Sequence, residues 1–450
     1  MTVRREAIAV TVATALVAAA FAVPRLDLGS LRPYLTASAA DIRRYRIAPP
    51  VSGWWQAHVG WGSIAAVLIG GAAVRWAPGL AKRLRWRTLT LATWATSCGW
   101  AFALAMIDGW QRGFADRLQG PGEYLGEVPS VTDIPQMLRG FTGRILDFQQ
   151  NSWITHVSGH PPGALLTFVW LDRAGLTGGA WAGLLCLLVG SSAAVAVLVT
   201  LRTLADEATA RSAAPFVALA PTAIWVAVSA DGYFAGVAAW GIALMALAAT
   251  RAVRFPAASA AAAGLLVGWA MMLNYGLTLL AIPVLAVLMA ARNRRAALTA
   301  VGFAAIPALM VVAIFYALGF SWLEGYLLVQ QRYWQGVASV RPFEYWGWAN
   351  IALVVCAIGL GSVAGLTAMV DDVALRRRSG LHLLLLAAAY AIVVADLSML
   401  SKAEVERIWL PFTTWLTAAP ALLPASTHRW WLAANVVGAL LLNHLIFTYW

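Results

Sequence analysis

Apolar stretches long enough to cross a lipid bilayer recur along the whole chain. A membrane helix needs about 20 mostly apolar residues, and lipid offers no hydrogen-bond partners to an irregular backbone. By that criterion the sequence predicts an all-α, polytopic membrane protein with about 13 transmembrane helices. They cover approximately residues 6–24, 59–77, 88–108, 178–202, 213–229, 233–251, 257–273, 277–291, 296–319, 346–370, 381–397, 409–424 and 430–447.

Basic residues fall in alternate loops between these stretches, and they predict the orientation of the chain. Lys and Arg in short loops are retained on the cytoplasmic side. We therefore expect a multi-pass protein of the cell membrane with a cytoplasmic N-terminus and an extracytoplasmic C-terminus. The basic positions on the predicted inner side are Arg4, Arg5, Lys82, Arg83, Arg85, Arg87, Arg202, Arg211, Arg251, Arg254, Arg292, Arg294, Arg295, Arg376, Arg377, Arg378 and Arg429.

The composition agrees with a membrane protein, since 61% of the 450 residues are hydrophobic and only 12% are charged. Soluble domains carry far more charge. The formal net charge of +12 could suggest a nucleic acid partner, but the charges are dispersed over many loops instead of forming one basic face. We expect the bilayer as a partner and no nucleic acid. No internal repeat interrupts the chain, so residues 1–450 are expected to form a single transmembrane domain.

The largest predicted outer loop covers residues 109–177, and long ordered loops usually serve a function. Within it, apolar residues at helical spacing over 134–149 predict a helix on the membrane interface. The apolar segment 162–176 follows two prolines and is short for a span, so we expect a re-entrant or juxtamembrane helix there. This loop is the first place to look for an extracytoplasmic active site.

Three polar positions in and beside this loop are candidates for chemistry. Asp108 lies where a predicted span ends, so it is either a partly desolvated general base or a solvated charge at a helix end. His156 and His160 are spaced four residues apart and would share one face of a helix. They suit an anionic ligand or a structural role better than a metal pair, because no third ligand is evident nearby.

Further polar residues gather in the other predicted outer loops. Asp231 and Tyr275 lie in short connections, where Asp231-Gly232 is also ordinary turn chemistry. Arg332 and Arg341 lie among Trp and Tyr residues that fit either an aromatic belt or a sugar-binding surface, and both depart from the positive-inside pattern. Their guanidinium groups could contact a phosphate.

The last predicted outer loop is unusually rich in ionisable groups. It reads LSMLSKAEVERIWLPF over residues 397–412. Such groups at a helix entrance are costly unless they are solvated, paired or used. A solvated hairpin with an intrahelical ion pair is the alternative to a functional site. The ionisable residues are Lys402, Glu404, Glu406 and Arg407.

These features resemble the GT-C class of membrane glycosyltransferases, especially the bacterial relatives of protein mannosyltransferases and of lipid A aminoarabinose transferases. The resemblance is carried by Asp108 after a membrane helix, the large first outer loop, HPPG at 160–163 and ERIWLPF at 406–412. The sequence also resembles Trp- and Ala-rich membrane proteins of high-GC actinobacteria. The similar region covers roughly residues 88–425, with extra N-terminal helices over 1–87 and a C-terminal helix over 426–450. No adjacent Asp-Glu pair follows the first helix of this core.

The resemblance implies a glycosyltransferase that moves a sugar from a polyprenyl-phosphate-linked donor to a lipid, glycan or protein acceptor at the outer leaflet. Asp108 would be the catalytic base, and no cofactor beyond a possible divalent metal ion is implied. A transporter or lipid flippase, or a noncatalytic scaffold for envelope assembly, is the alternative. Ionisable residues collect at the outer ends of the spans rather than near the midplane, which favours the enzyme. The expected residues for substrate and phosphate binding are Lys402, Arg407, His156, His160, Arg332, Arg341, Glu404, Glu406, Asp231 and Tyr275.

Overall fold

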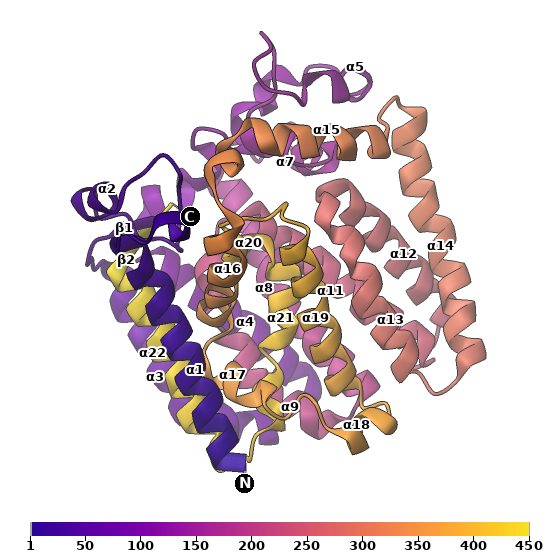
Figure 1. Cartoon of the computed structure of the whole chain (residues 1–450). Coiled ribbons are helices and arrows are strands. Elements are labelled where there is room, and N and C mark those ends of the chain that lie inside the picture. Colours follow the sequence, from indigo (N-terminus) through magenta and orange to yellow (C-terminus); the bar gives the residue numbers. More distant parts are fainter. Residues whose placement is uncertain (1, 450) are drawn as a thin grey trace.

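The computed structural model describes residues 2–449, and most of them are helical (Figure 1). Among these residues, 7 helices are long and apolar enough to cross a bilayer, or up to 8 if a bent pair is one span. A polytopic, mainly helical architecture is therefore as expected. The 7 helices are α1 (Thr2–Ala22), α3 (Trp61–Arg83), α8 (Gly179–Leu204), α11 (Ala230–Ala249), α12 (Pro256–Leu273), α14 (Arg294–Ala317) and α19 (Gly380–Leu397).

The structure does not confirm the predicted count of about 13 spans, because several apolar stretches are broken. The stretch 213–229 divides into α9 (Glu207–Ala218) and α10 (Ala223–Val226) around Pro221. The stretch 409–424 contains only α21 (Leu410–Leu416) and a 3₁₀ turn at Ala419–Leu422, with a proline near the start of each. The stretch 277–291 holds the short helix α13 (Ala281–Ala290) after a 3₁₀ turn. Two further stretches form α4 (Trp86–Ala105) and α22 (His428–Leu445), which are not among the 7.

The predicted span 346–370 is a bent pair of helices. The axes of α16 (Phe343–Ile358) and α17 (Leu360–Leu366) differ by 106°. Gly359 joins them with φ +80°, a conformation that favours glycine, and an added Cβ would lie 2.5 Å from Asn435 Oδ1. Asn435 on α22 accepts a 2.7 Å hydrogen bond from the Gly361 backbone N–H, so it holds the bend in place.

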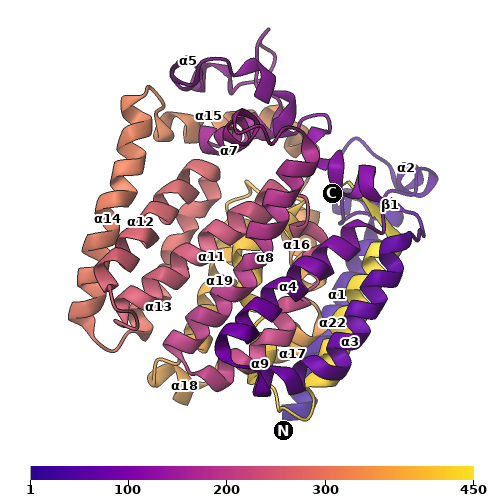
Figure 2. The same cartoon turned by 180° about the vertical axis from the view of Figure 1, so that it is seen from behind.

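The helices lie side by side with two distinct ends (Figures 1 and 2). Helices α8, α11 and α12 pack in sequence through the middle, and α14 packs on α12 at one side. Helices α1, α3 and α22 form a layer at the opposite side. The beginning of α1 lies at the same end as α9 and α18 (Asp372–Arg376), whereas the C-terminal end of the described chain lies at the other end. That other end, called here the loop end, carries α2 (Ala39–Arg44), α5 (Ile134–Arg139), α7 (Pro162–Arg173) and α15 (Trp322–Gln335).

A small antiparallel ribbon at the loop end was not predicted and departs from an all-α fold. Strand β1 (Gly53–Trp55) pairs with β2 (Ile446–Thr448), with Gly53 opposite Thr448. The predicted helix 430–447 therefore ends two residues early, at Leu445. The ribbon ties a loop near the beginning of the chain to its last described residues.

The predicted interfacial helix over 134–149 is mostly absent. Helix α5 stops at Arg139, and a 3₁₀ turn follows at Thr142–Arg144. The apolar side chains of Met137, Leu138, Phe141 and Ile145 are buried within the protein rather than presented to a bilayer. The helix predicted over 162–176 is present, since α7 (Pro162–Arg173) occupies most of that region. A short helix, α6 (Thr155–Ser158), precedes it. The buried first two turns of α7 pack the loop onto the bundle.

Candidate active site

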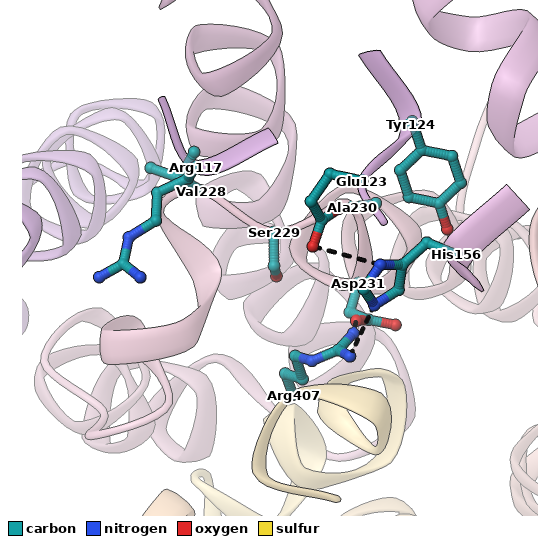
Figure 3. Close-up of a pocket in the computed structure, with 9 residues that line it drawn as sticks. All are labelled: Arg117, Glu123, Tyr124, His156, Val228, Ser229, Ala230, Asp231 and Arg407. Carbon is teal, nitrogen blue, oxygen red and sulfur yellow. Dashed lines mark hydrogen bonds and ion pairs between the residues drawn. The ribbon is translucent and has the colours of Figure 1, made fainter. Parts of the chain in front are cut away.

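A small polar pocket lies at the loop end of the bundle (Figure 3). Three segments meet there: the loop 109–177, the start of α11, and the short helix α20 (Val405–Ile408). In this closed arrangement the pocket has room for about one water molecule. Its lining consists of Arg117, Glu123, Tyr124, His156, Val228, Ser229, Ala230, Asp231 and Arg407.

Asp231 enters the pocket from the first turn of α11. The Ser229 side chain caps this helix by accepting a 3.0 Å hydrogen bond from the Gly232 N–H, and α11 begins at Ala230. The expected tight turn at Asp231-Gly232 is therefore wrong, because both residues are helical. A helix N-terminus favours a negative charge, which suits a carboxylate that is only 2% exposed.

Arg407 is the centre of the pocket's ion-pair network. Its Nη1 donates a 2.6 Å hydrogen bond to Asp231 Oδ2, and its Nη2 donates a 2.7 Å hydrogen bond to Glu404 Oε2. Arg407 is buried, and a buried charge is tolerated only when it is paired and hydrogen-bonded. The two carboxylates thus hold the guanidinium group in one position.

Glu404 connects Arg407 to a second arginine. Its other oxygen, Oε1, accepts a 3.2 Å hydrogen bond from Arg341 Nη2. Burial alone would raise the pKa of Glu404, but Arg407 and Arg341 outweigh that effect and lower the pKa to about 2. Glu404 is therefore ionised at neutral pH.

An unusual backbone places Glu404 between these arginines. Ala403 and Glu404 have φ values of +75° and +62°, a region that non-glycine residues rarely adopt. Asn350 on α16 stabilises this loop, because its Oδ1 accepts a 3.3 Å hydrogen bond from the Ala403 N–H and its Nδ2 donates a 2.9 Å one to the Ser401 carbonyl. The strained loop is thus supported by a fully buried side chain.

His156 has a definite tautomer in this network. Its Nδ1 lies 2.9 Å from the Gly122 carbonyl oxygen, which can only accept, so Nδ1 carries the hydrogen. Its Nε2 then accepts the 3.0 Å hydrogen bond from Arg407 Nη2. Burial, assisted by Arg407, lowers the pKa of His156 to about 4, so the ring is neutral at pH 7. His160 lies behind it, with Nδ1 2.7 Å from the His156 carbonyl oxygen.

Glu123 faces His156 across the pocket (Figure 3). Its Oε1 lies 3.3 Å from His156 Nδ1. Burial raises the pKa of Glu123 to about 7, although Arg407 opposes the shift. A carboxyl group with a pKa near working pH suits a general base, because it can both lose and accept a proton there.

Asp108 belongs to a neighbouring cluster and does not line the pocket. Its carboxylate is paired with Arg112, with Arg117 Nη2 at 2.8 Å and with His58 Nε2 at 2.7 Å. Arg117 belongs to both places, since it also lines the pocket. Because the Asp108 carboxylate contacts Arg117 and lies outside the pocket, the geometry favours Asp108 as a residue that positions Arg117.

The same cluster is tied to the end of the described chain. Arg112 and Arg117 both donate hydrogen bonds to the Thr448 carbonyl oxygen, and Arg117 also donates to the Tyr449 carbonyl oxygen. The ribbon of β1 and β2 therefore supports Arg117 from one side while Asp108 supports it from the other.

Arg341, Lys402 and Arg332 lie around the pocket without lining it. Arg341 braces the loop, with Nη1 donating a 2.8 Å hydrogen bond to the Lys402 carbonyl oxygen. Lys402 Nζ donates to the Ala338 carbonyl oxygen at 2.7 Å, and lies over the Trp334 ring. Arg332 pairs with Asp147 and donates a 3.3 Å hydrogen bond to Ser158 Oγ. In this conformation these cations join α15 to the neighbouring loops at the loop end.

Tyr275 and Glu406 are also outside the pocket. The Tyr275 ring packs against Trp322 and Tyr326 of α15. Glu406 is fully buried, and both its carboxylate oxygens lack a hydrogen-bond partner among residues 2–449. Neither side chain is placed to contact a ligand in the pocket.

The carboxylates of the pocket do not form a metal site in this arrangement. Within the described part of the chain, no group of three or more His, Cys, Asp and Glu residues is positioned to hold a metal ion. Asp231 and Glu404 are both engaged by Arg407. A divalent metal requirement stays a prediction.

The sequence reasoning missed Arg117, Glu123, Tyr124 and Ser229. Glu123 follows a Pro-Gly pair in a turn-rich stretch, so no helical or strand spacing relates it to His156. The available signal was weak: an acid beside an aromatic residue in a loop already selected for its length. Ser229 could have been recognised as a helix cap, since Ser is a preferred residue at that position.

Comparison with known proteins reveals similar structures but no similar sequence. The sequence matches no family model and no curated protein. The structure is similar to the Archaeoglobus fulgidus oligosaccharyltransferase in complex with Zn and sulfate, with a TM-score of 0.52 and 15% identity over 80% of this chain. It is also similar to the apo form, with a TM-score of 0.53 and 11% identity over 81% of this chain.

The chain spans about half the length of these structures, covering 53% and 56% of them. Oligosaccharyltransferase is a GT-C class glycosyltransferase, so the similarity supports the predicted GT-C-like fold. The nearer resemblance to protein mannosyltransferases and aminoarabinose transferases stays a prediction. With this comparison, the chain is a multi-pass membrane protein that shares the fold of an archaeal oligosaccharyltransferase over most of its length and has a buried polar pocket at its loop end.

Proposed function

We propose that the protein is a glycosyltransferase that moves a sugar from a polyprenyl-phosphate-linked donor to an extracytoplasmic acceptor at the outer leaflet. The observation that carries the proposal is the convergence of Glu123, His156, Asp231 and Arg407 on one pocket at the loop end of a GT-C-like fold. The basic residues of the opposite loops support an outward-facing pocket, because such residues are retained in the cytoplasm.

In the proposed reaction Glu123 is the general base. Its carboxylate takes the proton from an acceptor hydroxyl, and the hydroxyl oxygen forms a new bond to the anomeric carbon of the sugar. The bond from that carbon to the donor phosphate oxygen breaks, and the polyprenyl phosphate leaves with the electron pair. A pKa of about 7 lets Glu123 accept this proton at neutral pH.

Arg407 and Arg117 are the proposed partners of the departing phosphate. They are the two arginines that line the pocket. Negative charge on the phosphate grows as the bond breaks, so a fixed cation stabilises the transition state more than the bound donor. Neutral His156 accepts a hydrogen bond from Arg407 and adds no competing charge.

A transporter or lipid flippase is the second candidate, and one observation favours it. The bent pair α16 and α17 interrupts a membrane span, as in many transporters. The ionisable pocket nevertheless lies at the loop end, next to the long outer loop, where an extracytoplasmic acceptor can arrive. This placement favours transfer over transport.

A transfer assay tests the proposal. Proteoliposomes containing wild type, Glu123→Gln or Asp108→Asn are supplied with radiolabelled polyprenyl-phosphate sugars and with envelope lipid, glycan and protein fractions as acceptors. We expect labelled product with wild type, none with folded Glu123→Gln, and reduced product with Asp108→Asn. Loss of labelled product with Asp108→Asn but not with Glu123→Gln would instead identify Asp108 as the general base. Movement of labelled lipid between leaflets without product would indicate a flippase.

A further inference from the structure

Three arginines surround a second pocket, at the outer end of α1 and away from the candidate active site. Arg25 follows α1, Arg43 lies on α2, and Arg46 lies in the loop after it; the Trp55 side chain of β1 completes this basic pocket. Its lining shares no residue with the pocket around Arg407. The basic pocket is therefore a separate site.

The basic pocket has no internal counter-charge. Within residues 2–449, none of the three arginines forms an ion pair with a carboxylate. The nearby carboxylate of Asp41 is used in the cap of α2, where it accepts hydrogen bonds from both the N–H and the hydroxyl of Ser38. Like charges gathered without a partner repel one another, so an external anion would relieve the repulsion.

Arg25 is held in position for such an anion. Its guanidinium group lies 5.4 Å from the centre of the Trp55 ring and donates hydrogen bonds to the backbone carbonyls of Phe21 and Ile47. The membrane-length segment of the first helix ends at Arg25. An arginine at the end of a span lies at the level of lipid headgroups.

An apolar groove continues from this pocket along the membrane-facing layer. It lies between α1, the bend of α16 and α17, and α22, and has a volume of about 270 Å³. That is far more than the roughly 10–15 Å³ that one water requires. Phe21 and Trp55 line both the groove and the basic pocket, so the two are continuous. Along α1 the groove reaches down to Thr14, about 10 Å of helix below Phe21.

We propose that the basic pocket and the groove together bind one anionic glycerophospholipid. Its phosphate would contact Arg25, Arg43 and Arg46, and one acyl chain would fill the groove beside α1 and α22. The order of the two features matches such a lipid, with cations at headgroup depth and apolar walls below them. The donor phosphate in the proposed reaction belongs beside Arg407, so the occupant here is a phospholipid of the surrounding membrane.

Native mass spectrometry of the purified full chain tests the headgroup. The protein in detergent is titrated with phosphatidylglycerol, phosphatidylcholine or polyprenyl phosphate. We expect one tightly bound phosphatidylglycerol, and affinity about tenfold lower in the Arg43→Ala/Arg46→Ala variant. Arg44→Ala is the matched control, because Arg44 is exposed on the same helix and does not line the pocket. Equal binding of phosphatidylcholine, or equal loss in the control, would overturn the proposal.

A groove-filling variant tests the acyl chain. Gly438 lines the groove, and an added Cβ would meet no atom within 4 Å, so Gly438→Leu adds bulk to the groove without a backbone clash. Gly302→Leu is the control, since Gly302 on α14 has the same open surroundings outside the groove. Only Gly438→Leu should weaken phosphatidylglycerol binding.

Unchanged binding to Gly438→Leu would refute the proposal that an acyl chain occupies the groove. Displacement of phosphatidylglycerol by polyprenyl phosphate would show that the site binds the donor instead. Neither result depends on transfer activity, so the two proposals can fail separately.

Discussion

Arg407 and Asp231 lie 176 residues apart in the sequence, yet Arg407 Nη1 donates a 2.6 Å hydrogen bond to Asp231 Oδ2. The contact joins the start of α11 to α20 at the floor of the pocket. Both side chains are buried, so removing Arg407 would leave the Asp231 carboxylate without this cation, whereas Arg407 would keep Glu404 as a partner if Asp231 were removed. The pair therefore both builds the pocket and supplies its fixed cation.

Replacement of Arg407 should abolish transfer. We expect Arg407→Gln to lower kcat by about 100-fold or more, because the departing phosphate loses its cation. Removing one member of a buried pair can also cost about 3–5 kcal/mol of stability. The double variant Arg407→Gln/Asp231→Asn, which is neutral at both positions, separates the two effects. It should fold better than Arg407→Gln and remain inactive. Lys402→Gln is the control, since Lys402 Nζ binds a carbonyl outside the pocket; equal loss there would contradict the assignment.

The pH dependence of transfer should report Glu123. Only the deprotonated carboxylate can act as the base, so kcat/KM should rise with pH through about 7. Glu123→Gln should remove this step together with about 100-fold or more of the rate. A flat profile between pH 5 and 8 in wild type, or the same rise in a residually active Glu123→Gln, would assign the step to another group.

Glu123 also predicts how stability depends on pH. Burial raises its pKa in the folded state to about 7 from an ordinary value of 4.5, so the folded state binds the proton more tightly than the unfolded state. The resulting stabilisation is complete below about pH 4.5 and is lost as pH rises through about 7. Thermal unfolding of wild type and Glu123→Gln should be measured across this range. As pH falls from about 7 to about 4.5, the Tm of wild type should rise relative to the Tm of Glu123→Gln. Parallel curves would refute the shifted pKa.

Asp108→Asn should affect the donor more than the chemistry. Loss of the carboxylate charge weakens the 2.8 Å contact with Arg117, so Arg117 should no longer be fixed at the pocket. We expect a higher KM for the donor and a smaller fall in kcat than in Glu123→Gln. A catalytic base would show the reverse pattern, with kcat falling by orders of magnitude and KM unchanged.

Asn350→Ala should destabilise the loop that carries Glu404. Three hydrogen bonds of Asn350, to Asp396, Ser401 and Ala403, would be lost from a buried site. Buried polar groups left unpaired cost about 1–3 kcal/mol each, so a clear fall in Tm is expected. Transfer should fall as well, since Glu404 would no longer position Arg407. Asn151→Ala, at an exposed position, should leave both unchanged.

Much of the architecture was predictable because apolar length is a strong signal of membrane helices. The long helices α1, α3, α8, α12 and α14 occupy the expected stretches. The predicted count is not confirmed because stretches such as 213–229 and 409–424 have the composition of a span but are broken near Pro221 and Pro420. Composition does not reveal where a proline will divide a helix and where it will be accommodated.

The candidate site was predictable only in part, for a different reason. Arg407, His156 and Asp231 were selected individually as ionisable groups near span ends, and the structure brings them together. Glu123 was not selected, because its importance arises from burial beside His156, which the sequence does not encode locally. Asp108 was selected for its place at a helix end, but two arginines and His58 engage it outside the pocket.

The pairing of β1 with β2 affects the order in which the protein can be completed in the cell. Arg117 leaves the ribosome early, whereas the carbonyl groups of Thr448 and Tyr449 that bind it are made after all of the membrane-length helices. A nascent chain that has not yet reached β2 can insert most of its bundle but lacks these contacts to Arg117. The pocket therefore gains its final support late in synthesis.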